Sequence, residues 1–290
     1  MSAAVSAARR PGREAVAAKG WLTAHRWLLL RRTAQFAILA LFLAGPVTGA
    51  WIVKGNLSSS LTLGVLPLTD PYLLLQSLAA GILPYREALI GGAIVLAFYL
   101  LVGGRVFCAW VCPMNVVTDA AAWLRRRLGL KGGRVPSADT RYWLLGFTFV
   151  AALATGSLAW EWVNPVSMLH RGLIFGFGLA WGIVAAVFLY DLLLAPRGWC
   201  GHLCPVGAFY SLLGRLVPLS VAADKRSACD DCMDCFAVCP EPQVIRPALK
   251  AVGQTHPFIL DRNCTTCGRC VDVCGKDVFR ITTRFDRSSS

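Results

Sequence analysis

The sequence predicts a polytopic α-helical membrane protein that ends in a small, cysteine-rich α+β domain. Three observations lead to this prediction. Hydrophobic residues make up 56% of the 290 residues and charged residues only 16%, several apolar segments are long enough to cross a bilayer, and the cysteines are bunched along the chain. Because about a quarter of the residues of an average soluble domain are charged, this composition favours a lipid environment.

Residues 1–27 are predicted to form a mobile basic leader near anionic lipid, because they are rich in Ala and Arg and show no apolar periodicity. The whole chain carries a formal net charge of +13. Its Lys and Arg residues flank the apolar segments, which is the pattern of membrane topology. We therefore expect lipid, and no nucleic acid, as a partner.

Residues 28–218 are predicted to form a membrane domain of four transmembrane helices, arranged as two repeated hairpins. The spans are apolar over about 20 residues, the length needed to cross about 30 Å of hydrocarbon, except for the second, which is the shortest unless it extends through Phe107. The spans are residues 33–53, 88–103, 143–163 and 173–194. The stretch 61–83 is interrupted by Pro67 and Pro71, which favours a re-entrant or interfacial segment over a further span.

Lys and Arg residues are concentrated before the first span and between the second and third spans, and they are sparse in the other short flanks. Cytoplasmic loops carry the excess of Lys and Arg, so we expect a multi-pass protein of the bacterial inner membrane with both termini cytoplasmic. The 12 cysteines then fall on the reducing side, where disulfides rarely persist.

The C-terminal segment, residues 219–290, is predicted to be a cytoplasmic, bacterial-type ferredoxin-like domain with two [4Fe–4S] clusters. The spacing Cys-x-x-Cys-x-x-Cys-x-x-x-Cys occurs twice in it. In such runs three cysteines wrap one cluster and the fourth ligates the other. The first cysteine set is therefore Cys229, Cys232, Cys235 and Cys274, and the second cysteine set is Cys264, Cys267, Cys270 and Cys239. Zinc is the alternative, but zinc sites use separated pairs rather than triplets.

Two further cysteine pairs, each with the spacing Cys-x-x-x-Cys-Pro, lie at the predicted cytoplasmic ends of the second and fourth spans: Cys108 with Cys112, and Cys200 with Cys204. On a continuous helix each pair shares one face, so the four thiols are candidates for a further cluster or metal site. The open alternative is that they are small buried thiols without a ligand.

The recurrence of this pair indicates that the membrane domain is duplicated. The outer loops are also alike, with Asp70-Pro71 in the first half and Asn164-Pro165 in the second. Internal repeats of this kind place a shared site at the interface between the halves.

Glu161 and His170 are the candidate catalytic residues for quinol oxidation. Quinol needs a proton acceptor beside an apolar slot, and Glu161 lies between two tryptophans in an otherwise apolar run. Ordinary loops also carry polar residues at such positions, and for any single residue that interpretation is favoured. None of the 4 histidines lies in the middle of a span, which excludes haem held by paired histidines inside the bilayer.

The motifs resemble those of the NapH/MauN family of ferredoxin-type membrane proteins. The resemblance extends from about residue 12 to residue 284, and it rests on AHRW at 24–27, GNLSSS at 55–60, PLTDP at 67–71, WEW at 160–162, GWCGH at 198–202 and CMDC at 232–235. It implies a quinol dehydrogenase component that passes electrons to a NapG-type periplasmic ferredoxin and onward to periplasmic nitrate reductase.

Two alternatives stay open beside that function. MauN-type members of the family are similar in plan, so the terminal acceptor is less firmly implied than the redox role. A protein of this build is also compatible with redox maturation or copper handling, in which the thiol pairs would bind or reduce the metal, or with redox sensing.

Overall fold

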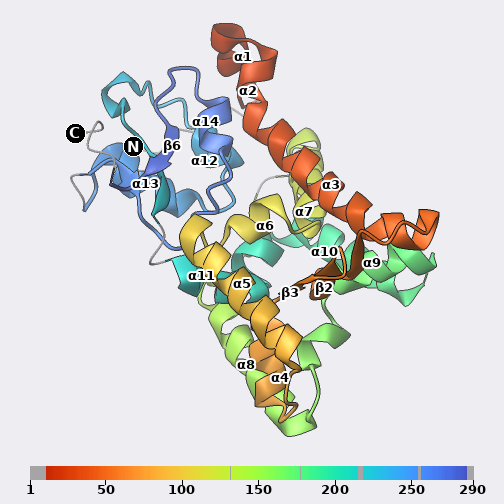
Figure 1. Ribbon diagram of the computed structural model, residues 1–290. Coiled ribbons are helices and arrows are strands. Elements are labelled where there is room, and N and C mark those ends of the chain that lie inside the picture. Colours follow the sequence, from red (N-terminus) through yellow and green to blue (C-terminus); the bar gives the residue numbers. More distant parts are fainter. Residues whose placement is uncertain (1–10, 131, 177, 215–217, 254–255, 286–290) are drawn as a thin grey trace. The chain divides into compact units, whose positions relative to one another are not determined.

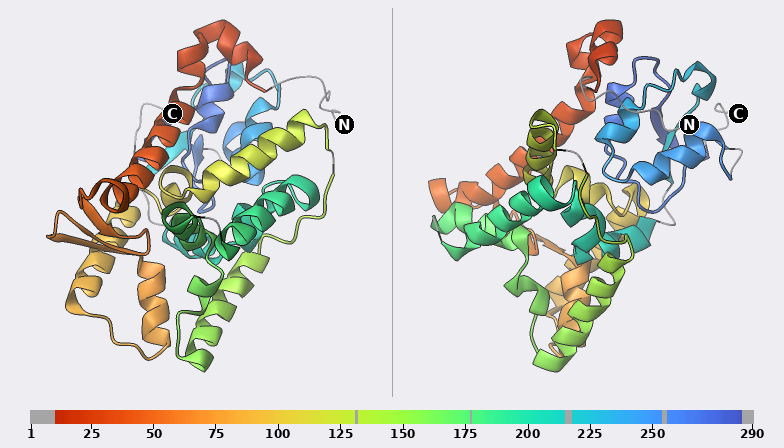
Figure 2. Two further views of the ribbon diagram at one scale, coloured as in Figure 1. Left: turned by 90° about the vertical axis from the view of Figure 1, so that its right-hand side faces the viewer. Right: turned by 180° about the vertical axis from the view of Figure 1, so that it is seen from behind.

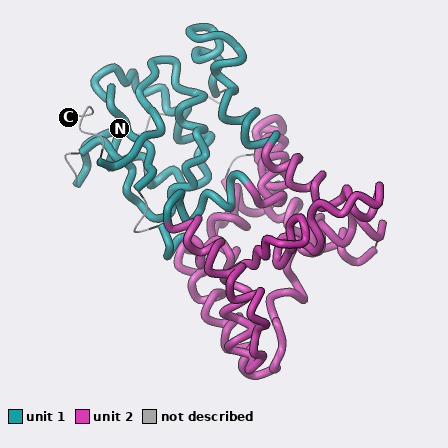
Figure 3. Tube along the Cα trace, viewed as in Figure 1, with its two compact units in different colours: residues 1–33, 101–110, 211–290 teal, residues 34–100, 111–210 magenta. Residues whose placement is uncertain are grey.

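The computed structural model describes residues 11–130, 132–176, 178–214, 218–253 and 256–285. Its contacts divide the chain into two compact units, shown in Figure 3. Unit 1 contains Met1–Thr33, Leu101–Trp110 and Ser211–Ser290, and unit 2 contains Ala34–Leu100 and Val111–Tyr210. These boundaries differ from the predicted domains because the N-terminal helices and the short segment around Cys108 pack with the C-terminal cysteine loops.

Unit 2 is mainly helical, and Figure 1 shows its helices. They are α3 (Arg26–Thr48, which begins in unit 1), α4 (Pro71–Ala79), α5 (Arg86–Val102), α7 (Met114–Arg127), α8 (Thr140–Thr155), η1 (Ala159–Trp162), α9 (Pro165–Phe175), α10 (Leu179–Leu189), η2 (Tyr190–Leu194), η3 (Trp199–Leu203) and α11 (Pro205–Leu213). The short helix α4 packs on α8, and α9 packs on α10.

Among the described residues, one helix is long and apolar enough by itself to cross a membrane: α3, with 23 residues and a mean hydropathy of 1.5. The other predicted spans correspond to shorter helices, with 17 residues in α5, 16 in α8, and 11 in α10 followed by 5 in η2. Helix α8 ends early because Gly156 adopts the left-handed conformation, with a φ of 61°, although apolar residues continue beyond it. Helix α10 begins late because Gly176 ends α9 first. The predicted bounds 143–163 and 173–194 are therefore wrong.

A small antiparallel sheet occupies part of the interrupted stretch 61–83. Strands β1 (Val53–Gly55), β2 (Ser59–Thr62) and β3 (Leu66–Thr69) pair in the order β1-β2-β3, and Figure 2 shows them side by side. Pro67 lies in the edge strand β3, where a proline is tolerated. Gly91 of α5 allows the sheet to approach, since a Cβ there would lie 3.0 Å from the Pro67 backbone. The strands, of 3, 4 and 4 residues, are too short to show the alternation of polar and apolar residues by which a strand is recognised in a sequence.

The predicted duplication appears in two short helices that begin in the same way. Asp70 caps α4 by accepting a hydrogen bond from the Tyr72 amide at 3.0 Å, and Asn164 caps α9 by accepting one from the Val166 amide at 3.1 Å. In each helix a proline occupies the first position, where its missing N–H costs nothing. In each half another helix, a Cys-x-x-x-Cys-Pro segment and a further helix then follow along the chain.

Unit 1 contains a three-stranded antiparallel sheet with short helices, which confirms the α+β prediction for the C-terminal region. Strands β4 (Leu219–Ala222), β5 (Phe258–Ile259) and β6 (Arg280–Thr283) pair in the order β5-β4-β6. The helical elements are α6 (Val106–Trp110), η5 (Arg226–Ala228), α12 (Asp234–Val238), η6 (Pro242–Val244), α13 (Ile245–Lys250) and α14 (Arg269–Val273). Val221, Ile245, Val278 and Phe279 form the buried core together with several of the cysteines.

Residues 11–27 do not form the mobile leader that was predicted, and the part of that leader before residue 11 lies outside the described residues. Helices α1 (Arg13–Lys19) and α2 (Trp21–Ala24) pack on α14. Lys19 Nζ donates hydrogen bonds to the carbonyls of Val271 and Cys274, at 2.8 and 2.9 Å. A cation stabilises the carbonyl end of a helix, so these contacts hold the N-terminal helices in place.

Candidate functional site

The two predicted cysteine sets line two separate cavities in unit 1. The first cysteine set (Cys229, Cys232, Cys235 and Cys274) borders a cavity of about 440 Å³, and the second (Cys239, Cys264, Cys267 and Cys270) borders one of about 350 Å³, where each volume includes space open to solvent. In each cavity the fourth cysteine comes from the other run of the sequence. The structure therefore brings the four cysteines of each set together, and the assignment of one cluster to each set stays a prediction.

The two cysteine loops have the same backbone conformation at matching positions. Asp231 and Thr266, the residues before the second cysteine of each run, have φ values of 59° and 45°. Met233 and Gly268, the residues after that cysteine, have φ values of 63° and 71°. Non-glycine residues rarely adopt positive φ, so the recurrence marks a specific loop that turns its cysteines inward around one centre.

Burial changes the acidity of these thiols. It raises the pKa of Cys235 to about 12 and that of Cys264 to about 11, and it raises the pKa of Cys270 well above the usual range. Burial also opposes ionisation of Cys267, but the neighbouring Arg269 and Arg31 lower its pKa overall. Cluster ligands are thiolates, so loading the second cysteine set must release protons from the buried thiols.

Among the described residues, no three His, Cys, Asp or Glu side chains are gathered closely enough to hold a single metal ion. Four sulfurs around one zinc ion lie about 3.8 Å apart, because each Zn–S bond is about 2.3 Å long. The sulfurs that hold a cubane are spaced more widely, since they surround four iron atoms. The wide, cavity-lining arrangement of both cysteine sets therefore fits a [4Fe–4S] cluster better than zinc.

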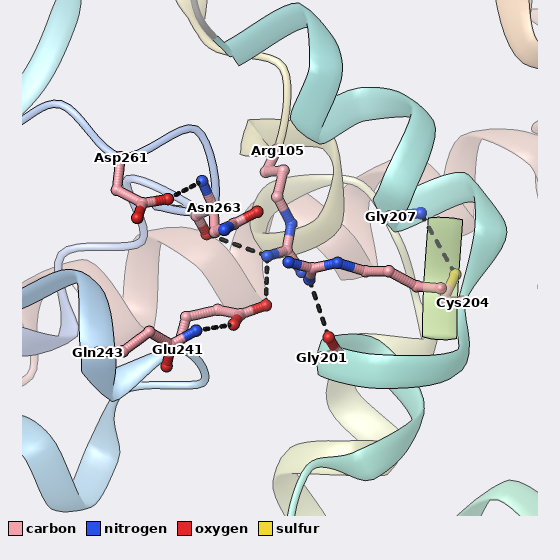
Figure 4. A network of polar contacts seen from close by, with 9 residues as sticks. Arg105, Gly201, Cys204, Gly207, Glu241, Gln243, Asp261 and Asn263 are labelled. Carbon is pink, nitrogen blue, oxygen red and sulfur yellow. Dashed lines mark hydrogen bonds and ion pairs between the residues drawn. The ribbon is translucent and has the colours of Figure 1, made fainter. Parts of the chain in front are cut away.

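A buried ion pair that the sequence did not reveal fixes the second cysteine loop (Figure 4). Arg105 Nη1 contacts Glu241 Oε1 at 2.5 Å and donates to the carbonyl of Asn263 at 3.0 Å. Both charged side chains are at most 2% exposed. Asn263 immediately precedes Cys264, so Arg105 holds the start of this loop. In the sequence Arg105 stood out only as one of many positive charges flanking the spans.

The Cys-x-x-x-Cys-Pro segments do not continue as helices through both cysteines. Helix α6 contains Cys108 but ends at Trp110, before Cys112. In the second pair, Cys200 lies in η3, a π-type turn that ends at Leu203, before Cys204. Cys108 belongs to unit 1, whereas Cys112, Cys200 and Cys204 belong to unit 2. The condition for a shared helical face, a helix that continues through both cysteines, is therefore not met in either pair.

Within unit 2 the second pair lies against the helix that follows the first pair. Thr118 Oγ1 of α7 is 3.8 Å from Cys200 Sγ. Cys112 and Trp199 pack against one buried cluster formed by Met114, Leu169, Val184 and Val187. The two halves of the repeat thus meet beside their cysteine pairs.

Several polar groups hold the second pair in position. Asp191 Oδ1 accepts a hydrogen bond from the Trp199 amide at 2.9 Å, and Arg141 Nη1 donates to the carbonyl of Gly201 at 2.8 Å. The Gly207 amide donates to Cys204 Sγ at 3.4 Å (Figure 4). Asp191 and Arg141 are fully buried. These contacts fix the backbone on both sides of Cys200.

Glu161 lies in η1, just before α9, within a polar cluster. Its carboxylate accepts hydrogen bonds from Asn164 at 2.6 Å, from Ser167 at 2.8 Å and from Ser58 at 3.4 Å. Ser58 lies next to the small sheet, so three separate parts of unit 2 meet at this carboxylate. The sequence pointed to Glu161 and Asn164 but not to the two serines, which are common residues without a distinctive pattern.

His170 lies further along the chain in α9, where its ring packs edge-on against Phe42 with centroids 5.7 Å apart. The ring is 5% exposed, and its Nε2 has no hydrogen-bond partner among the described residues. Burial, together with the adjacent Arg171, lowers the pKa of His170. No contact joins His170 to Glu161 within the described parts of the chain, so the structure does not bring the two candidates together.

Trp160 connects the polar cluster to the second cysteine pair. Its ring stacks on Trp199, with centroids 6.5 Å apart and planes inclined by 20°. Glu161 follows Trp160 and Cys200 follows Trp199. This stacking brings the segment around Glu161 next to the segment that carries Cys200.

Cysteine-lined cavities of this kind, held in repeated loops, define the chain as an iron–sulfur protein. The comparisons with known families agree. The family described as "4Fe-4S dicluster domain" matches residues 228–278, and the family described as "4Fe-4S binding domain" matches residues 87–131 and again residues 177–221. The latter two segments contain the four cysteines of the Cys-x-x-x-Cys-Pro pairs. The cofactors of the chain are therefore [4Fe–4S] clusters.

Curated relatives define the family. The chain is 52% identical to the ferredoxin-type protein NapH of Escherichia coli over 96% of both chains. It is 52% identical to the methylamine utilization ferredoxin-type protein MauN of Methylorubrum extorquens (97% of this chain, 96% of the relative) and 55% identical to MauN of Paracoccus denitrificans (93% and 95%). No solved structure shows significant similarity. The chain belongs to the NapH/MauN family of ferredoxin-type proteins.

Replacing Gly268 by alanine is expected to destabilise the second cysteine loop by about 2 kcal/mol or more. The φ of Gly268 is +71°, and an added Cβ would lie 2.4 Å from Cγ of Trp27. The matched control is Gly253→Ala, because Gly253 has a φ of +76° but an added Cβ there would meet nothing within 4 Å. Thermal unfolding of the loaded protein measures both variants. Equal losses of stability would show that the contact with Trp27 is unimportant.

Proposed function

We propose that the chain is a multi-pass protein of the bacterial inner membrane that oxidises quinol and delivers electrons through iron–sulfur clusters. A NapG-type periplasmic ferredoxin would then carry them to periplasmic nitrate reductase. Membership of the NapH/MauN family and the [4Fe–4S] cofactors support the electron-transfer role. The substrate and the direction of transfer are the parts that experiment must test.

The proposed topology has four spans with cytoplasmic termini. Helix α3 is long enough to cross alone, and the 17 residues of α5 and the 16 of α8 lie near the lower limit of about 17 for a spanning helix. The capped short helices α4 and α9 would enter the membrane without crossing it, which is how re-entrant segments are built. The distribution of Lys and Arg supports this orientation.

The observation that carries the proposal is the position of Glu161. Its carboxylate is held by Ser58, Asn164 and Ser167, and it follows Trp160, whose ring stacks on Trp199 beside Cys200. A fixed proton acceptor thus lies close in the fold to a pair of thiols within a segment that matches a 4Fe-4S binding domain. Quinol oxidation needs both a proton acceptor and a nearby electron acceptor.

The chemistry balances with these groups. Oxidation of one quinol to quinone releases two protons and two electrons. Glu161 would take one hydroxyl proton, while the hydrogen bonds from Ser167 and Asn164 keep its carboxylate pointed at the substrate. The bound clusters supply one-electron acceptors that receive the two electrons in turn. The second proton passes to water at the membrane surface.

The choice of terminal acceptor rests on the family alone. The similarity to NapH and to MauN is equal at 52% for the two relatives aligned over 278 and 280 residues. A MauN-like role, in which the electrons reach a different system, is therefore the second candidate. Reduction of nitrate by membranes that contain the chain and a periplasmic nitrate reductase separates the two roles.

Replacing Glu161 by glutamine is expected to slow quinol oxidation by a factor of about 10² to 10⁴, the contribution of a positioned proton acceptor. Glutamine keeps the size of the side chain but cannot take the proton, so iron and sulfide content should stay unchanged. Turnover is measured with menadiol as donor and a dye as acceptor. The matched control is Glu87→Gln in α5, where the side chain is exposed. Unchanged turnover in Glu161→Gln would remove this residue from the mechanism.

A further inference from the structure

The two cysteine loops of unit 1 have the same conformation but opposite surroundings. In the first loop Asp230 and Asp231, between Cys229 and Cys232, are exposed. In the second loop the corresponding residues, Thr265 and Thr266, are each only 7% exposed. Sequence spacing alone makes the loops equivalent, so the difference arises from what covers the second loop.

Helix α6 covers one side of the second loop. Trp110 Nε1 donates a hydrogen bond to the carbonyl of Thr266 at 3.3 Å, and Arg105, at the start of the same segment, donates to the carbonyl of Asn263 at 3.0 Å. These two hydrogen bonds hold the loop backbone on both sides of Cys264, at Asn263 and at Thr266. Cys108 lies between Arg105 and Trp110, so the helix that holds the second loop also carries the first thiol of a Cys-x-x-x-Cys-Pro pair.

The start of α3 covers the other side. Trp27 packs against Gly268 and meets Trp110 edge-on, with ring centroids 6.0 Å apart. Asp272 of α14 accepts hydrogen bonds from the amides of Trp27 and Leu28, at 3.1 and 2.9 Å. Those amides belong to the first turn of α3, where the helix itself offers them no acceptor. Asp272 therefore acts as the acceptor that caps the N-terminus of α3. The apolar helix α3 therefore begins directly on the second loop.

The described contacts of the first loop are of a different kind. Asp231 pairs with Lys250 at the surface, and Asp234 accepts a hydrogen bond from the amide of Gly12 at 2.8 Å. These contacts come from α13 and from the N-terminal helices. They leave Asp230 and Asp231 open to solvent.

We propose that the second cysteine loop is the side of unit 1 that first receives the electrons of quinol, and that Trp110, at the end of the helix that carries Cys108, is the positioning residue that seals and orients it. The first loop, with its exposed Asp230 and Asp231, is then the side that exchanges electrons with the solution. This order rests on the electron-transfer role proposed above. Electron tunnelling slows steeply with distance, so the loop that is packed against α6 is favoured for the inner step.

The first test compares how fast iron is lost from the two cysteine sets. The dithionite-reduced, full-length protein is exposed to bathophenanthroline disulfonate, and EPR follows each cluster signal; the variants Cys235→Ser and Cys270→Ser assign the signals to the sets. Iron held by the second set should leave about tenfold more slowly than iron held by the first, because its loop is covered. Equal rates, or faster loss from the second set, would overturn the proposal.

Trp110→Leu should remove most of that difference and raise the reduction potential of the second set only, because water near a cluster stabilises its reduced, more negative form. Trp110→Phe should restore the shielding partly, since it keeps the ring but not the N–H donor. The matched control is Trp21→Leu, because Trp21 is 56% exposed. A potential shift in the first set, or no shift in either set, would contradict the role of Trp110.

Reduction by menadiol tests the order itself. In Cys235→Ser the signal of the second set should still appear at the wild-type rate. In Cys270→Ser the signal of the first set should be slowed at least about tenfold with menadiol but not with dithionite, which reaches it from solution. Fast menadiol reduction of the first set in Cys270→Ser would refute the order. If menadiol reduces neither set in the wild-type protein, the quinol function fails, and the iron-release and potential measurements still decide on the sealing by Trp110.

Discussion

Replacing Cys270 by serine is expected to remove one of two [4Fe–4S] clusters, and with it about four of eight iron atoms bound by the C-terminal loops. Cys270 is buried and lines the second cavity, so its thiol is well placed to be one of the four cluster ligands. Replacing Cys235, which is equally buried in the first loop, should remove the other cluster. Iron analysis and EPR of the reduced variants measure both losses.

The same experiment tests the interlocked assignment through the fourth cysteine of each run. Cys239 follows the first run in sequence but lines the second cavity, and Cys274 follows the second run but lines the first cavity. The EPR signal lost in Cys239→Ser should therefore match the one lost in Cys270→Ser. Loss of the Cys235→Ser signal instead would show that each run binds its own cluster.

Replacing Arg105 by methionine is expected to destabilise unit 1 by about 3–5 kcal/mol, because Glu241 is left as an uncompensated buried charge. Arg105 and Glu241 are 1% and 2% exposed at their side chains, whereas Arg280, which pairs with Asp224 at the surface, is 44% exposed. Arg280→Met is therefore the matched control, with an expected loss of about 0–1 kcal/mol. Thermal unfolding of the detergent-solubilised protein compares them.

A second replacement separates the charge from the packing. In the double variant Arg105→Met, Glu241→Leu both charges of this buried pair are removed, so most of the lost stability should return. A double variant as unstable as Arg105→Met would mean that the packing of the arginine side chain, not the ion pair, holds the second loop. In that case the ion pair between Arg105 and Glu241 contributes nothing measurable to the free energy of unfolding.

The cysteine sets could be predicted from the sequence because their spacing is rigid. A run such as Cys264-x-x-Cys267-x-x-Cys270 folds locally, and the exchange of the fourth cysteine follows from the way two such loops pack. The similarity of Asp70-Pro71 and Asn164-Pro165 was also visible in the sequence, but their role as helix caps became clear only in the structure.

The parts that were missed depend on contacts between residues far apart in the chain. Arg105 and Glu241 are separated by 136 positions, and Trp160 and Trp199 stack across most of a helical hairpin. The early end of α8 escaped detection because hydropathy continues past Gly156, although the backbone turns there. The strands near Pro67 are too short to show a period of two. Tertiary packing, rather than local preference, decides each of these features.

Iron and acid-labile sulfide analysis of one variant tests the central claim most directly. In the variant that carries serine at Cys108, Cys112, Cys200 and Cys204, only the two cysteine sets of unit 1 remain. We predict about eight iron and eight sulfide atoms for each folded chain, with two EPR signals after reduction. A folded variant without iron would contradict the claim that these eight thiolates alone hold two [4Fe–4S] clusters.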